Sequence, residues 1–214
     1  MSVFPLFNAS FVGLFLVGLF TWNTFLICFV GGCSVISIVI YVYDSIDINF
    51  HYESAFWLFV LSEFIIFCTL LTCCLIYDVW GSVSLSNSLE IPFVGCFILL
   101  GSSITITAFH HLLNWNYSWV FLLFTVLLGI LFVFLQVYEL NDIGMNIFDS
   151  SFYASSFCTV GLHFSHVLLG VVGLFTLLLV GGIKFGVYRC TVLTWYWHFV
   201  DYIWLLVYTV VYVC

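Results

Sequence analysis

The stretch WVFLLFTVLLGILFVFLQVY, residues Trp119–Tyr138, decides the fold class of this chain. It contains no charged side chain over its whole length. A helix needs about 20 apolar residues to cross the roughly 30 Å hydrocarbon core of a bilayer, because each residue adds about 1.5 Å of rise. The stretch therefore predicts one transmembrane helix.

The composition of the whole chain has the same character. Of its 214 residues, 65% are hydrophobic and 6% are charged, and the mean hydropathy is +1.29. A soluble domain of this size would lack the polar residues that cover a surface in water. We therefore interpret the chain as an all-α integral membrane protein. Only two residues are basic, which excludes a basic nucleic-acid-binding surface.

Seven segments of the chain have the length and composition of a membrane-spanning helix, and polar clusters separate them. Because no linker, internal repeat or low-complexity tract interrupts them, we predict one polytopic membrane domain over residues 1–214. The N-terminal residues lack the basic region and cleavage site of a signal peptide, so we interpret them as the start of the first helix. The predicted helices are Phe4–Thr21, Phe25–Tyr43, Ser54–Tyr77, Ile91–His110, Trp119–Tyr138, Phe152–Ile183 and Thr194–Cys214.

The two basic residues predict the orientation of the chain. Lys184 and Arg189 both fall between the sixth and seventh predicted helices. Basic loops stay on the side of the membrane from which the chain inserts. With seven spans, the N-terminus then lies on that same inner side and the C-terminus on the opposite side.

Nine cysteines are scattered along the chain, most of them inside apolar runs. They lack the paired Cys-x-x-Cys spacing that is typical of zinc sites. We therefore expect them to pack as small apolar side chains and to hold no metal ion.

Glu63 is the carboxyl group that the predicted spans place most deeply. It follows Ser54 by nine residues, which puts it about 14 Å into a helix and near the bilayer midplane. An ionised and unpaired carboxylate costs several kcal/mol at that depth, so we expect a buried, protonated group. Two interpretations stay open: a proton-linked or reactive carboxyl, and a neutral acid hydrogen-bonded to a neighbouring helix.

Two histidines of the sixth predicted helix, His163 and His166, are three residues apart and share one helix face. They suggest either a haem or metal site or hydrogen bonds between helices. Haem would need another histidine at matching depth on a second helix, and the predicted topology supplies none. We therefore favour hydrogen bonding between helices. Glu139 closes the fifth helix, where a carboxylate is usually solvated or interfacial.

A second polar group is predicted at the inner interface of the membrane. His198 and Asp201 lie in the stretch WYWHFVDYIW, three residues apart and on one helix face. The predicted topology places them at the level of His110 and His111, which end the fourth helix. We predict that these four residues form one polar layer between helices, within the aromatic belt that marks a membrane interface.

Several motifs, in order along the chain, resemble those of cytochrome c oxidase subunit III. The last of them matches the family pattern YWHFVDxxWxxxY, with Trp204 and Tyr208 in register. Ser165 departs from the glycine that the family has in its GxHGxH motif. The motifs are Ser62-Glu63, Glu90-Ile91-Pro92, Ala108-Phe109-His110-His111, Leu135-Gln136 with Glu139, Gly161-Leu162-His163-Phe164-Ser165-His166, and Tyr196-Trp197-His198-Phe199-Val200-Asp201.

The resemblance implies a core subunit of cytochrome c oxidase that itself holds no redox centre and no catalytic residue. Haem a, haem a3, CuA and CuB would belong to subunits I and II of the complex. Subunit I would be the main partner, beside subunit II, accessory subunits, phospholipids such as cardiolipin and a respiratory supercomplex. The implied role is to support assembly, stability, proton uptake and sustained turnover of the enzyme that reduces oxygen and pumps protons.

The resemblance also implies a location and an architecture. The location is the mitochondrial inner membrane, with the N-terminus in the matrix and the C-terminus in the intermembrane space. The first two helices would form a small bundle, separated from the other five by a lipid-filled cleft. The chain lacks the basic residues that the family uses for lipid head groups, and Lys184 is the nearest candidate to replace one.

Two other functions remain as alternatives. A proton-coupled membrane transporter would explain Glu63, but such proteins usually show internal repeats or broken helices. A membrane anchor that carries a b-type haem would explain the histidines, but their predicted depths do not match.

Overall fold

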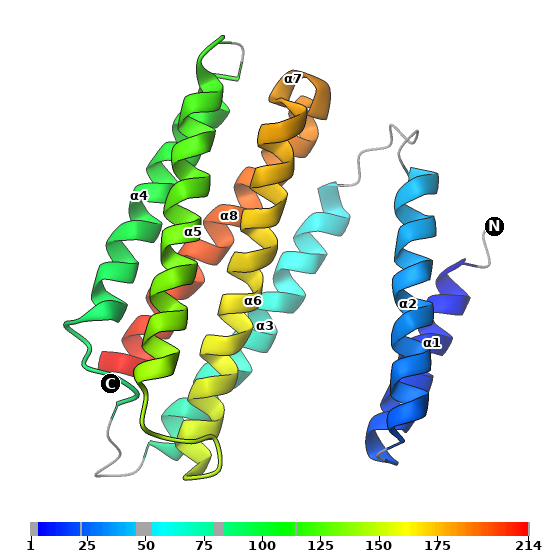
Figure 1. Cartoon of the computed structure of the whole chain (residues 1–214), viewed down its shortest axis with the longest axis vertical. Helices are drawn as coiled ribbons and strands as arrows, with labels where there is room; N and C mark the ends of the chain where they lie inside the picture. The colour runs from blue at the N-terminus through cyan, green and yellow to red at the C-terminus, as the bar shows by residue number, and fades with distance from the viewer. Residues whose placement is uncertain (1–3, 22, 46–52, 79–83, 114, 214) are drawn as a thin grey trace. The chain divides into compact units, whose positions relative to one another are not determined.

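A computed structural model describes residues 4–21, 23–45, 53–78, 84–113 and 115–213, and all regular secondary structure in these ranges is helical (Figure 1). The chain divides into two compact units, residues 1–51 and 52–214, and each is described by itself. The first unit contains α1 (Phe4–Phe20) and α2 (Thr24–Ser45). The second contains α3 (Glu53–Tyr77), α4 (Ile91–His111), α5 (Ser118–Asp142), α6 (Ser151–Val180), α7 (Gly182–Phe185), α8 (Val187–Val207) and the π-helical turn η1 (Tyr208–Val213).

The first unit is a helical hairpin with a tight turn. The Thr21 hydroxyl donates to the carbonyl of Val17 at 2.8 Å, where α1 ends. The Asn23 side chain accepts a hydrogen bond from the backbone N–H of Leu26 at 3.2 Å, which satisfies one free donor at the start of α2. Gly18 lets the helices approach, because a Cβ atom there would lie 3.1 Å from Cγ1 of Ile27.

The core of the second unit forms where α4, α5, α6 and α8 pack together, with α3 against α6 and α8 (Figure 1). The Trp197 ring, with no exposed surface, is held in a slot between two glycines. A Cβ atom would approach the ring to 2.9 Å at Gly129 and to 2.8 Å at Gly170. Side chains are small at these positions because the indole ring occupies the space that a Cβ atom would need.

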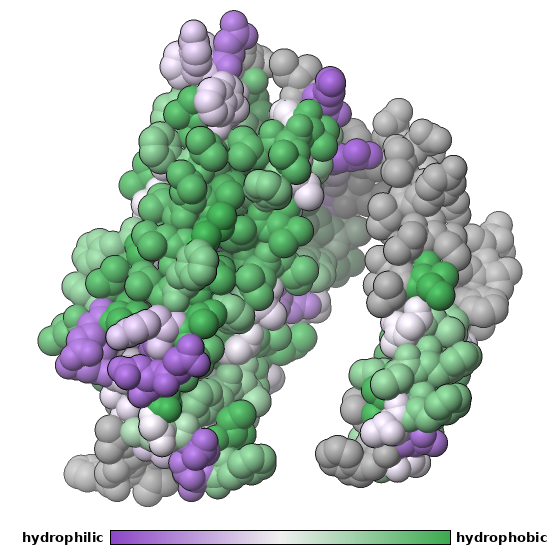
Figure 2. Space-filling model, viewed as in Figure 1, coloured by the Kyte–Doolittle hydropathy of each residue, from purple (hydrophilic) through white to green (hydrophobic). Residues whose placement is uncertain are grey.

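The surface of the second unit is largely apolar. Figure 2 shows mainly hydrophobic residues along its helices and hydrophilic residues towards the two ends of the unit. Four of the described helices, α3 to α6, are long and apolar enough to cross a membrane by length and composition. This finding supports the interpretation of the chain as a membrane protein. The number of seven spans stays a prediction.

Each of the seven predicted segments is helical in the structure, although several predicted ends differ by a few residues and the predicted last residue, Cys214, lies outside the described residues. Two of the differences occur at glycines. The sixth helix ends at Val180 and not at Ile183, because Gly181 has a φ of 84°. The last helix begins at Val187 and not at Thr194, after Gly186 with a φ of 92°. Glycine adopts this conformation without strain and so ends helices. Between the two glycines, Lys184 and Phe185 were predicted as a loop, but together with the two residues before them they form α7.

Candidate functional site

The described polar side chains of α4 and α8 meet along the length of their contact, which we name the α4–α8 seam. The two helices run antiparallel. His110, late in α4, bonds Thr191, early in α8, whereas Ser102, earlier in α4, bonds Trp197, which lies farther along α8. Small hydroxyl side chains of α4 face the histidine, tryptophan and aspartate of α8. The seam consists of Ser102, Ser103, Thr107 and His110 of α4 with Thr191, Trp197, His198 and Asp201 of α8.

His198 is bonded through both ring nitrogens. Nδ1 lies 2.8 Å from Oγ of Ser103, and Nε2 lies 3.2 Å from Oγ1 of Thr107. The single hydroxyl proton of Thr107 is donated to the Ser103 carbonyl at 2.8 Å. Thr107 therefore accepts from Nε2–H of His198. These bonds place a proton on Nε2 of the imidazole, and the Ser103 hydroxyl is the partner of Nδ1.

Ser102 connects Trp197 and Asp201. Its hydroxyl oxygen accepts from Nε1–H of Trp197 at 2.9 Å. Its single proton faces two acceptors, the Leu99 carbonyl at 2.7 Å and Oδ1 of Asp201 at 3.4 Å. Asp201 is 2% exposed, and its Oδ2 has no partner among the described residues. Asp201 thus lies in the core, where the Ser102 hydroxyl is a distant partner of its Oδ1.

The four residues that were predicted to form one polar layer are placed differently. His110 bonds Oγ1 of Thr191 at 3.0 Å, closer to the α7 end of the seam than His198. His111 is exposed, because the next residue along a helix points about 100° away from the face that packs on α8. The described hydrogen bonds include none between His198 and Asp201. The prediction of a single layer is therefore wrong: three of the residues lie at successive levels along the seam.

A second polar contact joins α3 and α6. Oε2 of Glu63 lies 3.1 Å from Nε2 of His166, a pairing across 103 residues of sequence. The other ring nitrogen of His166 lies 2.8 Å from the carbonyl of Leu162. Tyr196 of α8 donates its hydroxyl to the carbonyl of His166 at 3.2 Å. Phe67 packs its ring edge-on to the imidazole at 5.4 Å.

These contacts limit where the proton of the pair lies. A carbonyl can only accept, so Nδ1 of His166 carries a proton and donates it to Leu162. One further proton must then lie between Nε2 and Oε2. Either a neutral Glu63 donates it to a neutral imidazole, or an imidazolium donates it to a carboxylate. The pair has no net charge in either arrangement, which lowers the cost of its position among apolar side chains.

Glu63 is less buried than the sequence predicted. Its side chain is 19% exposed, whereas that of His166 is 9% exposed. The reason is its position at the edge of the contact, since α3 buries only Phe67, Leu71 and Cys74 among its described residues. The carboxyl group is thus both paired and accessible from the surface of the unit.

His163 lies on the same helix as His166 but points into the core. It has no exposed surface, and its Nε2 lies 3.2 Å from the carbonyl of Val200 in α8, to which it donates. The ring packs against Trp204 at 5.0 Å and Phe132 at 5.7 Å. Its Nδ1 has no partner within the described part of the chain. The outer ring nitrogens of the two histidines therefore bond different helices, Nε2 of His163 bonding α8 and Nε2 of His166 bonding α3.

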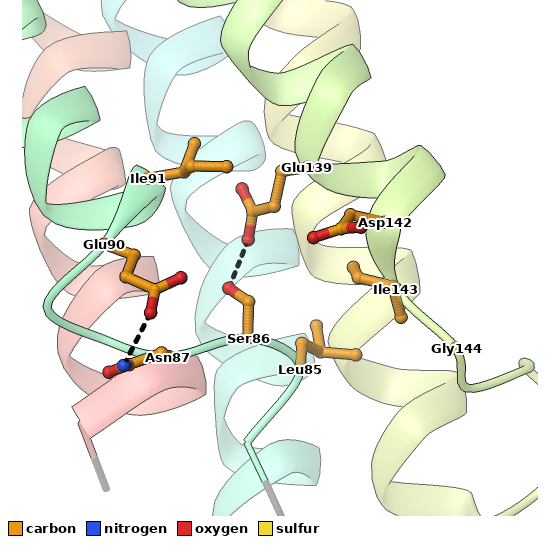
Figure 3. Close-up of a pocket in the computed structure, with 9 residues that line it drawn as sticks. All are labelled: Leu85, Ser86, Asn87, Glu90, Ile91, Glu139, Asp142, Ile143 and Gly144. Carbon is orange, nitrogen blue, oxygen red and sulfur yellow. Dashed lines mark hydrogen bonds between the residues drawn. The ribbon is translucent and has the colours of Figure 1, made fainter.

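Glu139 was predicted to be solvated or interfacial, and the structure contradicts the solvated alternative. It is 2% exposed, with Oε1 accepting from the Ser86 hydroxyl at 2.7 Å and Oε2 accepting from the Gln136 amide at 2.9 Å. Figure 3 shows it beside Ser86 at a cavity of about 170 Å³ where α4 begins and α5 ends. The segment before α4 covers the end of α5 through Ser86. The sequence around Glu139 alone does not reveal this cover. Glu90 and Asp142 line the same cavity.

The sequence contained one unused signal for the seam. The stretch GSSITIT, residues Gly101–Thr107, places four hydroxyl side chains within an apolar helix. Such side chains often hydrogen-bond across helices in a membrane. Three of them, Ser102, Ser103 and Thr107, contact α8 in the seam.

The described residues include no group of three or more His, Cys, Asp or Glu side chains that could hold a metal ion. Lys184, the candidate for a lipid head group, is exposed in α7.

Comparison with known proteins gives one consistent result. The family model described as "Cytochrome c oxidase subunit III" matches residues 10–214. Cytochrome c oxidase subunit 3 of Drosophila melanogaster is 38% identical over 136 residues, which cover 59% of this chain and 51% of that protein. The protein of the same name from Loxodonta africana is 36% identical over 134 residues, with the same coverage. The chain thus spans about half the length of the curated relatives it matches.

Proposed function

Because the chain belongs to the cytochrome c oxidase subunit III family, we propose that it is a core subunit of cytochrome c oxidase that holds no redox centre of its own. The observation that carries this proposal is the family match over residues 10–214. The enzyme would transfer electrons from cytochrome c to oxygen and pump protons, with its haems and coppers in other subunits.

The proposed setting is the mitochondrial inner membrane, which the chain crosses several times. We propose seven spans in a two-helix and a five-helix bundle, with phospholipid in a cleft between them. The four long apolar helices support several of these spans. The two basic residues, Lys184 and Arg189, both lie between α6 and the middle of α8, and such residues favour the inner side, which with seven spans supports a matrix location for the N-terminus.

The proposed task is mechanical support of the catalytic subunit. The α4–α8 seam, with Trp197 and Asp201 almost fully buried, gives the second unit a fixed helix arrangement. A fixed arrangement can present a constant surface to subunit I, the proposed main partner, and so support assembly and sustained turnover. The accessible Glu63–His166 pair is the proposed place of any proton-linked role.

The experiment compares the intact oxidase with the same complex after selective removal of this chain. The proposal predicts unchanged haem absorption and initial oxygen consumption, but a shorter working life during turnover. Normal working life without the chain would contradict the supporting role. Loss of the haem spectrum would contradict a chain that holds no redox centre.

A further inference from the structure

A short connecting segment lies over the buried carboxyl group of Glu139 (Figure 3). Residues 84–89, which we name the strap, lead into α4 and cover the end of α5. Leu85, Ser86 and Asn87 of the strap line the cavity of about 170 Å³, and Glu139 lines it as well. The cavity exceeds the roughly 10–15 Å³ that one water molecule requires. Glu139 thus borders a space of water size while the strap closes it to solvent.

Two described hydrogen bonds tie the strap to other helices. The Ser86 hydroxyl donates to Oε1 of Glu139 at 2.7 Å. The Tyr208 hydroxyl of η1 donates to the carbonyl of Ser88 at 3.1 Å. Tyr208 is itself well supported, because its ring stacks on Tyr212 at 6.3 Å. Tyr208 therefore connects the strap to the end of α8 without bonding Glu139.

The rest of the strap is held weakly. Leu85 is its one buried side chain, whereas Asn87 and Leu89 are exposed. The side-chain amide of Asn87 donates to Glu90 at 2.9 Å, so this bond lies at the junction with α4 and does not reach α5. Segments with few buried contacts open at a lower cost in free energy than the core of a domain.

The closed strap shields a carboxyl group that has no cationic partner in this chain. Both basic side chains, Lys184 and Arg189, belong to α7 and the start of α8, and η1 begins 19 residues after Arg189, about 28 Å of helix rise away. The two oxygens of Glu139 accept from neutral donors, Ser86 and Gln136. A buried carboxylate loses solvation, and opening of the strap would return water to it. This gain offsets part of the loss of the strap's hydrogen bonds.

We propose that the strap is a gate between Glu139 and the aqueous phase, and that Tyr208 holds the gate closed. When the bonds of Ser86 and Tyr208 break together, water, protons and small cations reach the carboxyl group through the cavity. Tyr208 acts through the strap, so it is a positioning residue. The inference goes beyond the proposed function and does not depend on it.

Labelling by a water-soluble carbodiimide with an amine nucleophile tests the gate in the isolated complex. Tyr208→Phe keeps the ring and removes the hydroxyl. Tyr202→Phe is the matched control, since its hydroxyl has no described hydrogen bond and its side chain is exposed. Glu90 and Asp142 line the same cavity but are exposed, so their labels report access of the reagent. Peptide mass spectrometry measures the rate at each residue, with Glu139 as the readout.

Glu139 should be labelled slowly in the wild type and in Tyr202→Phe. In Tyr208→Phe its labelling should be about fivefold to tenfold faster, because loss of one hydrogen bond raises the open population by that factor. Glu90 and Asp142 should be labelled at the same rate in all three proteins.

Equal labelling of Glu139 in the wild type and Tyr208→Phe would overturn the proposal. Unlabelled Glu90 and Asp142 in the wild type would also overturn it, because a partner and not the strap would then control access. New labelling of the buried Asp201 in Tyr208→Phe would mean that the whole unit has loosened, which contradicts a local gate. Failure of oxidase subunits to co-purify would instead contradict the proposed function, with labelling still measurable.

Discussion

The α4–α8 seam and the α3–α6 contact both join two helices through polar side chains, but they differ in burial. In the seam, Trp197 has no exposed surface and Asp201 is 2% exposed. In the α3–α6 contact, the side chain of Glu63 is 19% exposed and depends on one partner, His166. A buried polar network costs free energy if any member is removed, whereas a group at an edge can regain water or lipid contacts. The α4–α8 seam is therefore suited to fixing the fold, whereas the α3–α6 contact is suited to a chemical role.

The largest expected effect is overpacking of the slot that holds Trp197. Gly170→Ala should destabilise the second unit by about 1–3 kcal/mol, because the added Cβ atom would lie 2.8 Å from two atoms of the indole ring. Thermal unfolding of the purified complex measures the change. Gly161→Ala on the same helix is the control, since its Cβ atom would have no neighbour within 4 Å. Equal stability of the two variants would contradict the packing described for the seam.

An effect in the same range is expected from removal of a hydrogen bond inside the seam. Ser102→Ala should cost about 1–3 kcal/mol, because it leaves Nε1–H of Trp197 without its acceptor in the core. Ser165→Ala is the matched control, since both hydroxyls donate at 2.7 Å to the carbonyl three residues earlier but Ser165 is exposed. Thermal unfolding should separate them. An equal loss in both variants would mean that the Trp197 bond contributes nothing.

The smallest effect on stability is expected at the α3–α6 contact. Glu63→Gln should change the unfolding temperature little, because an amide can still bond His166. It should, however, abolish labelling by a hydrophobic carbodiimide, which we expect to modify Glu63 in the wild-type complex. Peptide mass spectrometry locates the label. Asp201 and Glu139 are each 2% exposed. Labelling of either of them in place of Glu63 would contradict the conclusion that Glu63 is the more accessible carboxyl group.

The helices of both units follow from local features of the sequence. Long apolar runs and polar breaks predicted all seven segments. The start of the last helix differs from the structure by seven residues, and the other described ends differ by at most four, while the predicted end at Cys214 lies outside the described residues. The errors lie where Gly181 and Gly186 divide a polar stretch into a short helix and the start of α8. A polar cluster indicates a break but does not locate it. The family resemblance was also visible in the motifs, and the family match confirms it.

The partners of the polar side chains were not predictable in the same way. Glu63 and His166 were each identified, but their pairing depends on how α3 and α6 pack, which is not encoded in either segment alone. The same holds for Glu139, which is covered by Ser86 from a segment 53 residues earlier. Local sequence indicates which side chains are polar, and the packing of distant helices decides what they contact.

The central claim is that this chain is a non-redox subunit of cytochrome c oxidase. The most direct test is an absorption spectrum of the complex isolated through this chain, followed by a spectrum of the chain after its separation. We predict haem a absorption and other oxidase subunits in the complex, and no Soret band from the separated chain. A Soret band bound to the chain alone, or a complex without oxidase subunits, would contradict the claim.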